Sequence, residues 1–192
     1  MGLEPARARF PFRNGGYESF YLTARHPAEA KALWVRCTVT QAPGGSPEGH
    51  RWMTFFESAG PVAIREPGHP SAEGAWIRVG TASFGDGVAG GTAGDAVWNV
   101  SFTGTEAPLL YLPSERMYRA GLPRTKPVSL LPHARFTGSL RIGDRVEDLT
   151  GWRGMVGHNW GTEHAERWVW VHAILEEDAW IDLVAARVRM AP

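Results

Sequence analysis

Residues that could carry chemistry are concentrated in one short segment, residues 157–172. The segment contains three His, two Glu, three Trp and one Asn within 16 residues. Glycines stand at positions 151, 154, 157 and 161, just before and within it. Glycine at this density is typical of a kinked or bulged strand, so we expect an irregular backbone that leads into a regular strand at 167–175.

The predicted strand at 167–175 has two unlike faces. With the two-residue period of a strand, Trp168, Trp170 and His172 share one face, and the residues between them are small and aliphatic. A wide aromatic surface with one imidazole is typical of the wall of an apolar small-molecule pocket, here the interior of a barrel. Packing of this face against a second layer of the protein is the alternative.

A metal centre is the first chemistry that the histidines suggest. His158, His164 and His172 have the spacing H-x5-H-x7-H, with Glu163 among them. This spacing matches neither the HExxH pattern nor a Cys/His finger. We therefore predict no metal and no cofactor, and we expect the polar residues of 157–164 to serve as hydrogen-bonded groups in a turn that includes His158 and His164.

Acid catalysis is a second chemistry that the sequence allows. Glu18, Glu57 and Asp182 each lie in a predicted strand among aromatic neighbours. A carboxyl group in such surroundings favours its neutral form and could donate a proton. The alternative for each is a charge that faces water or pairs with an arginine.

Other catalytic motifs are absent from the sequence. There is no GxSxG nucleophile motif, and Cys37 lies within an apolar strand, where an inert buried thiol is expected. The glycine-rich residues 85–91 lack the Lys-Ser/Thr ending of a phosphate-binding loop.

Composition excludes several classes of protein. Lys plus Arg is 20 and Asp plus Glu is 20, so the chain lacks the basic charge of a nucleic-acid-binding domain. The longest apolar stretches, such as 168–175, are far shorter than the roughly 20 residues that span a bilayer. The single cysteine excludes an internal disulfide framework. No secretory signal pattern opens the sequence, which favours a cytoplasmic location.

The elements that must position these residues are short strands. The 192 residues include 23 Gly and 14 Pro, which suits many strands joined by turns. We expect strands at 17–24, 33–40, 51–58, 61–66, 75–84, 96–103, 134–142, 145–149, 167–175 and 179–189. Gly143-Asp144 indicates one hairpin, and the acidic residues 176–178 between the last two strands indicate a second. Residues 27–33 and 114–120 could hold helical turns, 85–95 reads as a surface loop, and 107–132 reads as an irregular connection with short extended pieces. The pattern predicts an all-β protein, an antiparallel β-barrel or sandwich, with an arm at 1–14 and one barrel domain at 15–192.

Two segments resemble a known family. Residues 17–22, Tyr-Glu-Ser-Phe-Tyr-Leu, resemble the Glu-Trp-Trp-Tyr opening strand of the lipocalin-like (calycin) family that contains carotenoid hydratases (hydroxyneurosporene synthase) and tocopherol-cyclase-like proteins. Residues 157–161, Gly-His-Asn-Trp-Gly, with Glu-His-Ala at 163–165 and Trp-Val-Trp at 168–170, are similar to a signature of uncharacterised bacterial members. Ser19 and Phe20 replace the two tryptophans of the opening strand, so only Glu18 and Tyr21 match it.

The resemblance covers roughly residues 15–190 and implies both a fold and a ligand. It implies two calycin barrels in tandem, of which this chain would be the N-terminal one, with an apolar ligand in or between them. Family members add water to isoprenoid chains or close rings on them without a redox cofactor, and others move lipids. The partners expected are thus a hydrophobic small molecule and either a missing C-terminal barrel or a second copy in a homodimer.

Two functions follow as hypotheses. In the first, Glu18 (or Glu57 or Asp182) protonates an alkene and His158 or His164 positions water, giving a cofactor-free hydratase, cyclase or isomerase. The ligand would contact the side chains of Tyr21, Trp160, Trp168, Trp170 and His172. In the second, the protein is a carrier without chemistry, or a structural β-domain of a larger protein. Convergence of Glu18, a histidine and the tryptophan face on one cavity would distinguish the first from the second.

Overall fold

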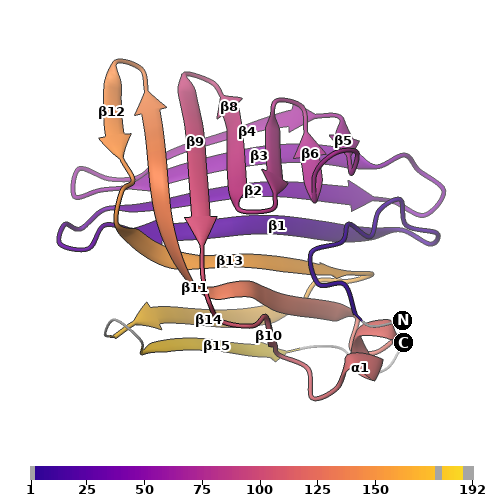
Figure 1. The fold of residues 1–192 in the computed structure, drawn as a ribbon. Coiled ribbons are helices and arrows are strands. Elements are labelled where there is room, and N and C mark those ends of the chain that lie inside the picture. The colour runs from indigo at the N-terminus through magenta and orange to yellow at the C-terminus, as the bar shows by residue number, and fades with distance from the viewer. Residues whose placement is uncertain (1–2, 176–178, 188–192) are drawn as a thin grey trace.

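A large antiparallel sheet that curls into a nearly closed barrel forms most of the molecule (Figure 1). The structure is a computed structural model that describes residues 3–175 and 179–187. The sheet contains, in spatial order, β4 (Val62–Gly68), β3 (Glu48–Phe56), β2 (Ala32–Gln41), β1 (Gly16–Arg25), β13 (Trp152–Gly161), β11 (Thr125–Ile142), β9 (Ala96–Thr103), β8 (Val88–Ala93), β7 (Ala82–Gly85), β6 (Ile77–Val79) and β5 (Pro70–Ser71). Two short strands, β10 (Leu109–Leu110) and β12 (Arg145–Asp148), also pair with β11. This architecture confirms the predicted all-β antiparallel barrel.

The last two described strands form a separate layer. β14 (Arg167–Ile174) and β15 (Trp180–Arg187) pair with each other and not with the large sheet. They lie below β13 and β11 in Figure 1. The predicted hairpin is confirmed by the pairing from Arg167↔Arg187 to Ile174↔Trp180, and its acidic turn at 176–178 lies outside the described residues.

Large apolar side chains fill the interior of the barrel. The largest fully buried ones are Trp98, Trp152, Phe20, Phe55, Phe84, Phe136, Leu22, Leu33, Met53, Ile77, Leu140 and Leu149. They come from alternate positions of the strands, as the two-residue period requires. The tryptophan face at 168–172 is not part of this interior, contrary to the expectation of a barrel lined by it, because β14 belongs to the outer hairpin.

β1 is the strand that joins the two layers. Its side chains are buried along nearly the whole strand, on both faces, whereas a strand with one wet face would alternate between buried and exposed. Phe20 and Leu22 point into the barrel, and Tyr17 and Tyr21 point outward to the hairpin. The two faces of β1 therefore serve two different parts of the molecule.

Three local predictions were wrong. The predicted loop at 85–95 contains β8, and the predicted strand at 75–84 is a hairpin of β6 and β7 that turns at Gly80, where φ is +58°. The connection at 107–132 does contain short extended pieces, β10 and the start of β11, which begins at Thr125. The third error is the helical turn at 27–33, because residues 27–30 form bends and no helix, whereas the helical turn at 114–120 is confirmed by α1 (Glu115–Arg119).

The backbone around residue 158 is also more regular than predicted. β13 pairs with β1 in one unbroken register from Tyr17↔Gly161 to Arg25↔Arg153. His158 therefore lies within a strand and not in a turn. The irregularities fall on the neighbouring strand instead, where the β11–β13 register shifts between Ser129 and Ala134. No helix in the described residues is long and apolar enough to cross a membrane.

Candidate functional site

A cavity of about 300 Å³ lies between the outer hairpin and the outward face of the large sheet. Its floor comes from β1, β2, β13 and the start of β11, and its roof comes from β14 and β15. The aromatic side chains that line it are Tyr17, Tyr21, Trp34, Tyr111, Trp168 and Trp170. The volume is at the lower end of the range for small-molecule sites, and the aromatic lining is typical of them.

Strand register brings the floor residues together. Tyr21 of β1 is paired with Arg36 of β2 on one side and with Gly157 of β13 on the other. Because Gly157 has no side chain, the Tyr21 ring can lie against the backbone of β13. From above, Trp170 meets the Tyr21 ring edge to face, with 5.7 Å between the ring centroids. Burial raises the pKa of the Tyr21 hydroxyl far above its ordinary value, with the Asp182 carboxylate as the second cause, so the hydroxyl is neutral.

His164 closes one end of the cavity. It follows β13 in the connection to the hairpin and stacks on the Tyr17 ring at 3.6 Å between centroids. Desolvation against this ring and then the charge of Arg36 lower the pKa of His164 below its ordinary value. The pKa of Tyr17 is raised by burial to about 12. Both groups are therefore neutral near pH 7.

Several polar atoms of the cavity wall have no hydrogen-bond partner. Trp34 Nε1 and Asn159 Oδ1 are the clearest, and the buried hydroxyls of Tyr17 and Tyr111 have Thr125 and Asp182, respectively, as their polar neighbours. A buried polar group without a partner is costly, and such groups are rare in native proteins. Water or a bound molecule in the cavity would complete the hydrogen bonds of such groups.

Glu18 and His158 do not reach this cavity. They lie on the inward faces of β1 and β13, fully buried, and His158 Nε2 is 2.8 Å from Glu18 Oε1. The Glu18 carboxylate also accepts the backbone N–H groups of Arg9 at 2.8 Å and Phe10 at 3.1 Å. On its other side, His158 Nδ1 donates to the carbonyl of Pro5 at 2.6 Å. The pair thus holds the N-terminal arm against the barrel.

Trp160 belongs to the same anchoring cluster. Its ring stacks against His158 at 4.6 Å, and the Arg9 guanidinium lies 4.5 Å from its centroid on the arm side. Trp160 is among the residues that line a hollow with Leu3 and Tyr118, apart from the cavity under the hairpin. The predicted site residues are therefore divided: Tyr21, His164, Trp168 and Trp170 line the cavity, and Glu18, His158 and Trp160 anchor the arm.

His172 attaches the hairpin to the barrel. Its Nε2 donates to the carbonyl of Pro132 at 2.7 Å, and its Nδ1 accepts from Arg25 Nη2 at 3.1 Å. These two bonds fit the neutral imidazole, which has one donor and one acceptor nitrogen. Burial lowers the pKa of His172, in keeping with this form.

The other two predicted acids differ in position. Glu57 forms an ion pair with Arg145, whose Nη1 donates to both carboxylate oxygens at 3.0 Å, which matches the alternative given for it. Asp182 projects from β15 toward the large sheet, and its Oδ1 accepts from Trp170 Nε1 at 2.8 Å. Burial, and then a hydrogen bond with Asp182 and the charge of that carboxylate, raise the pKa of Tyr111, so the two groups are close.

Arg36, Trp34 and Tyr111 are site residues that the sequence interpretation missed. A signal for two of them was present: Trp34 and Arg36 alternate with apolar residues in the strand at 33–40, so they share one face. Tyr111 lies in a stretch that was read as irregular. Among the residues that the structure describes, no group of three or more His, Cys, Asp or Glu side chains is arranged to hold a metal ion.

Comparisons with known proteins identify relatives of unestablished role. No family model matches the chain. Uncharacterised proteins of two Mycobacterium tuberculosis strains, CDC 1551 / Oshkosh and H37Rv, are each 31% identical over 176 residues. The match takes in 90% of this chain and 53% of each relative, so the chain spans about half the length of the curated relatives it matches.

A solved structure shares the architecture. The crystal structure of a protein assigned as an AttH from Nitrosomonas europaea aligns with a TM-score of 0.56 and 15% sequence identity. The alignment covers 95% of this chain and 66% of that chain. At this identity the likeness concerns the fold alone.

Proposed function

We propose that this protein binds a hydrophobic small molecule, of isoprenoid or lipid type, between the outer hairpin and the barrel. The observation that carries the proposal is the aromatic cavity of about 300 Å³, whose wall also holds buried polar atoms without partners, among them Trp34 Nε1 and Asn159 Oδ1. Apolar ligands gain affinity from such a lining, and a few polar groups fix their orientation.

The lipocalin-like resemblance supports the ligand class and not its position. In that family the apolar ligand is expected in or between barrels. Here large side chains fill the barrel interior, and the aromatic cavity lies outside the wall, under β14 and β15. The proposed carrier function therefore uses the outer face of β1, where Tyr21 matches the family's opening strand.

Acid catalysis is a second candidate, and Asp182 is the residue that favours it. Of the three predicted acids, Asp182 alone lies beside the cavity wall, where its neighbours are the wall residues Trp170 and Tyr111. Glu18 is engaged by the arm and Glu57 by Arg145. A proton donor must reach its substrate, so in this alternative we assign the role of proton donor to Asp182.

A pair of adjacent substitutions tests ligand binding. Val184 points into the cavity, and Leu183, the next residue of β15, points outward and is 51% exposed. We expect the wild-type protein to bind the neutral dye Nile red at about one molecule per chain in a fluorescence titration. Val184→Phe should weaken binding at least about tenfold by filling the cavity, and Leu183→Phe should leave it unchanged.

Native mass spectrometry gives an independent test of the same proposal. The protein purified from its own source should carry an apolar molecule that an organic extract identifies, and Val184→Phe should carry less of it. A folded wild-type protein that is empty and does not bind the dye would exclude the carrier function. Conversion of the extracted molecule by the wild type, and not by Asp182→Asn, would favour catalysis over transport.

A further inference from the structure

We propose that the ligand of this cavity carries a carboxylate head group and that the Arg36 guanidinium binds it. The inference rests on the proposed function and names the chemical class of the ligand. It starts from a cation at the cavity wall that the protein itself does not neutralise.

The contacts of Arg36 within the described residues are all uncharged. Its Nε donates to Ser19 Oγ at 2.8 Å. Its guanidinium carbon lies 5.8 Å from the Trp34 ring centroid and 6.0 Å from that of Trp52. Burial lowers the pKa of the guanidinium below its ordinary value, because a charge is less stable where it is removed from water.

The carboxylates of this region are engaged elsewhere. Glu163, in the loop that carries His164, forms an ion pair with Arg124 at 2.5 Å. Asp182 accepts from Trp170 and lies beside Tyr111. An arginine that is partly removed from water without an anion is costly, and an anionic ligand offsets that cost.

The neighbours of Arg36 fit a carboxylate in particular. Tyr17 and Trp34 both line the cavity; Trp34 Nε1 is a buried donor without a partner, and the buried Tyr17 hydroxyl, whose polar neighbour is Thr125, is a second O–H donor. Arg36 itself offers a planar fork whose geometry matches the two oxygens of a carboxylate. These donors and the cation thus lie on the wall formed by β1 and β2.

The position of Arg36 also orients the ligand. Trp34 and Arg36 line a second hollow of about 220 Å³ on the outward face of β2, β3 and β4. Arg36 therefore lies between this hollow and the cavity under the hairpin. A head group bound at Arg36 leaves the apolar chain to run under Trp170, away from the exposed edge of the sheet.

A series of ligands with one chain length tests the head group. Decanoate, decanol and decyltrimethylammonium differ at the head and share a ten-carbon chain, so displacement of Nile red compares heads alone. We expect the wild type to bind decanoate about tenfold to a hundredfold more tightly than decanol, the range for hydrogen bonds to a charged group. Decyltrimethylammonium should bind more weakly than decanol.

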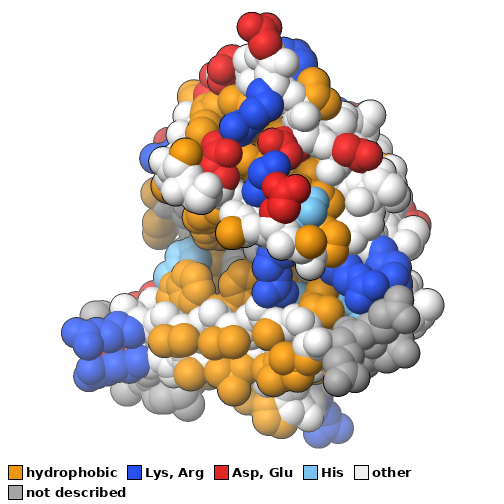
Figure 2. All heavy atoms as spheres, turned by 90° about the vertical axis from the view of Figure 1, so that its left-hand side faces the viewer, with side chains coloured by type: hydrophobic (Ala, Val, Ile, Leu, Met, Phe, Trp, Pro, Cys, Tyr) orange, Lys and Arg blue, Asp and Glu red, His pale blue; other side chains and the backbone are white. Residues whose placement is uncertain are grey.

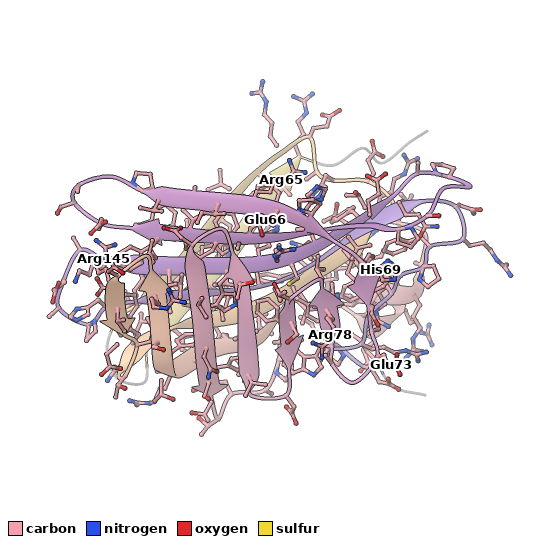
Figure 3. The ribbon with its side chains drawn as sticks, turned by 90° about the horizontal axis from the view of Figure 1, so that it is seen from above. Arg65, Glu66, His69, Glu73, Arg78 and Arg145 are labelled. Carbon is pink, nitrogen blue, oxygen red and sulfur yellow. The ribbon has the colours of Figure 1, made fainter. Side chains whose placement is uncertain are left out.

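Substitution of Arg36 locates the effect. Arg36→Gln should abolish the preference for decanoate while keeping the affinity for decanol, and Arg36→Lys should restore part of the preference through charge without the fork. Arg78→Gln is the matched control, because Arg78 is exposed on β6. It lies well away from Arg65 of β4, which lines the second hollow together with Arg36 (Figure 3). Its decanoate preference should equal that of the wild type.

The outcomes separate this inference from the proposed function. Equal wild-type affinities for decanoate and decanol would overturn the carboxylate assignment and leave a neutral-ligand site in the cavity. A decanoate preference that persists in a folded Arg36→Gln protein would also overturn it. If none of the three compounds displaces the dye and the dye itself does not bind, the proposed function fails and the inference fails with it.

Discussion

The Tyr21 ring lies directly against Gly157, its partner in the β1–β13 pair, so a Cβ atom on Gly157 would come within 2.4 Å of Tyr21 Cζ. This contact lets a large aromatic side chain lie flat on the outer face of the barrel. It connects the glycine-rich segment to the cavity, because Tyr21 forms part of the cavity floor. The glycine therefore provides space for a side chain, and it does not mark a bulge.

Gly157→Ala should displace Tyr21 and lower both stability and ligand affinity. Overpacking of this kind costs about 1–3 kcal/mol, so we expect a loss of that size in the free energy of unfolding measured in urea. Dye affinity should fall in parallel. Gly121→Ala is the control, since a Cβ there meets no atom within 4 Å. Equal stability of the two variants would show that Tyr21 moves aside without cost.

Glu18→Gln should release the N-terminal arm. The variant keeps the size of the side chain but loses the negative charge that accepts hydrogen bonds from His158 and from the backbone N–H groups of Arg9 and Phe10. We therefore expect a loss of about 2–3 kcal/mol in the free energy of unfolding. Trypsin should then cleave after Arg7 and Arg9 faster than in the wild type. Glu57→Gln breaks a surface pair with Arg145 and should cost less than about 1 kcal/mol, with no change in arm cleavage. An arm that stays resistant in Glu18→Gln would contradict the anchoring role.

Cys37 should report on global unfolding. The thiol is fully buried, and burial raises its pKa to about 12, so almost no thiolate is present at pH 8. We expect Ellman's reagent to leave the native protein unmodified at this pH and to react with one thiol per chain in guanidinium chloride. Rapid reaction without denaturant would mean that β2 opens locally in the native state.

Sequence patterns predicted the strands and the tryptophan hairpin, because each depends on local alternation and turn residues. Gly143-Asp144 between two apolar runs indicated the β11–β12 hairpin, and the structure pairs Ile142 with Arg145. The tryptophan face of β14 indicated a pocket wall, and Trp168 and Trp170 do line a cavity. These features lie within single hairpins, where residues near in sequence decide the outcome.

Packing between layers could not be predicted from the same patterns. Glu18 and Tyr21 are three residues apart on one strand, so the two-residue period places them on opposite faces, and they cannot converge on one cavity. Which face meets the arm and which meets the hairpin depends on contacts such as His158 with Pro5 and His172 with Pro132, between residues far apart in sequence. Arg36 was missed for the same reason. Whether a carboxylate lies beside its guanidinium depends on which strands pack around β2, and the sequence pattern does not give that.

Docking of the hairpin should depend on pH through His172. Burial is the main cause that lowers the pKa of His172, and the charges of Arg25 and His133 act in the same direction. The hydrogen bond to Pro132 and the charge of Asp182 raise the pKa, but the net shift is downward. A histidine whose pKa is lower in the folded state stabilises that state fully above its ordinary value of 6.5 and loses this contribution as pH falls. We therefore expect the hairpin to loosen below about pH 6.5. His164, whose pKa is also lowered, acts in the same direction.

His172→Gln separates the two histidines, because a glutamine amide can donate to Pro132 and accept from Arg25 without titrating. In the wild type, hydrogen exchange of the β14–β15 amides should accelerate between pH 7 and pH 5 beyond the intrinsic change, and tryptophan emission should shift to the red as the face of Trp170 meets water. His172→Gln should show a smaller pH effect, the remainder being that of His164. His69→Gln, a substitution at an exposed position, should behave as the wild type. Identical pH profiles for His172→Gln and the wild type would remove His172 as the group that couples protonation to docking of the hairpin.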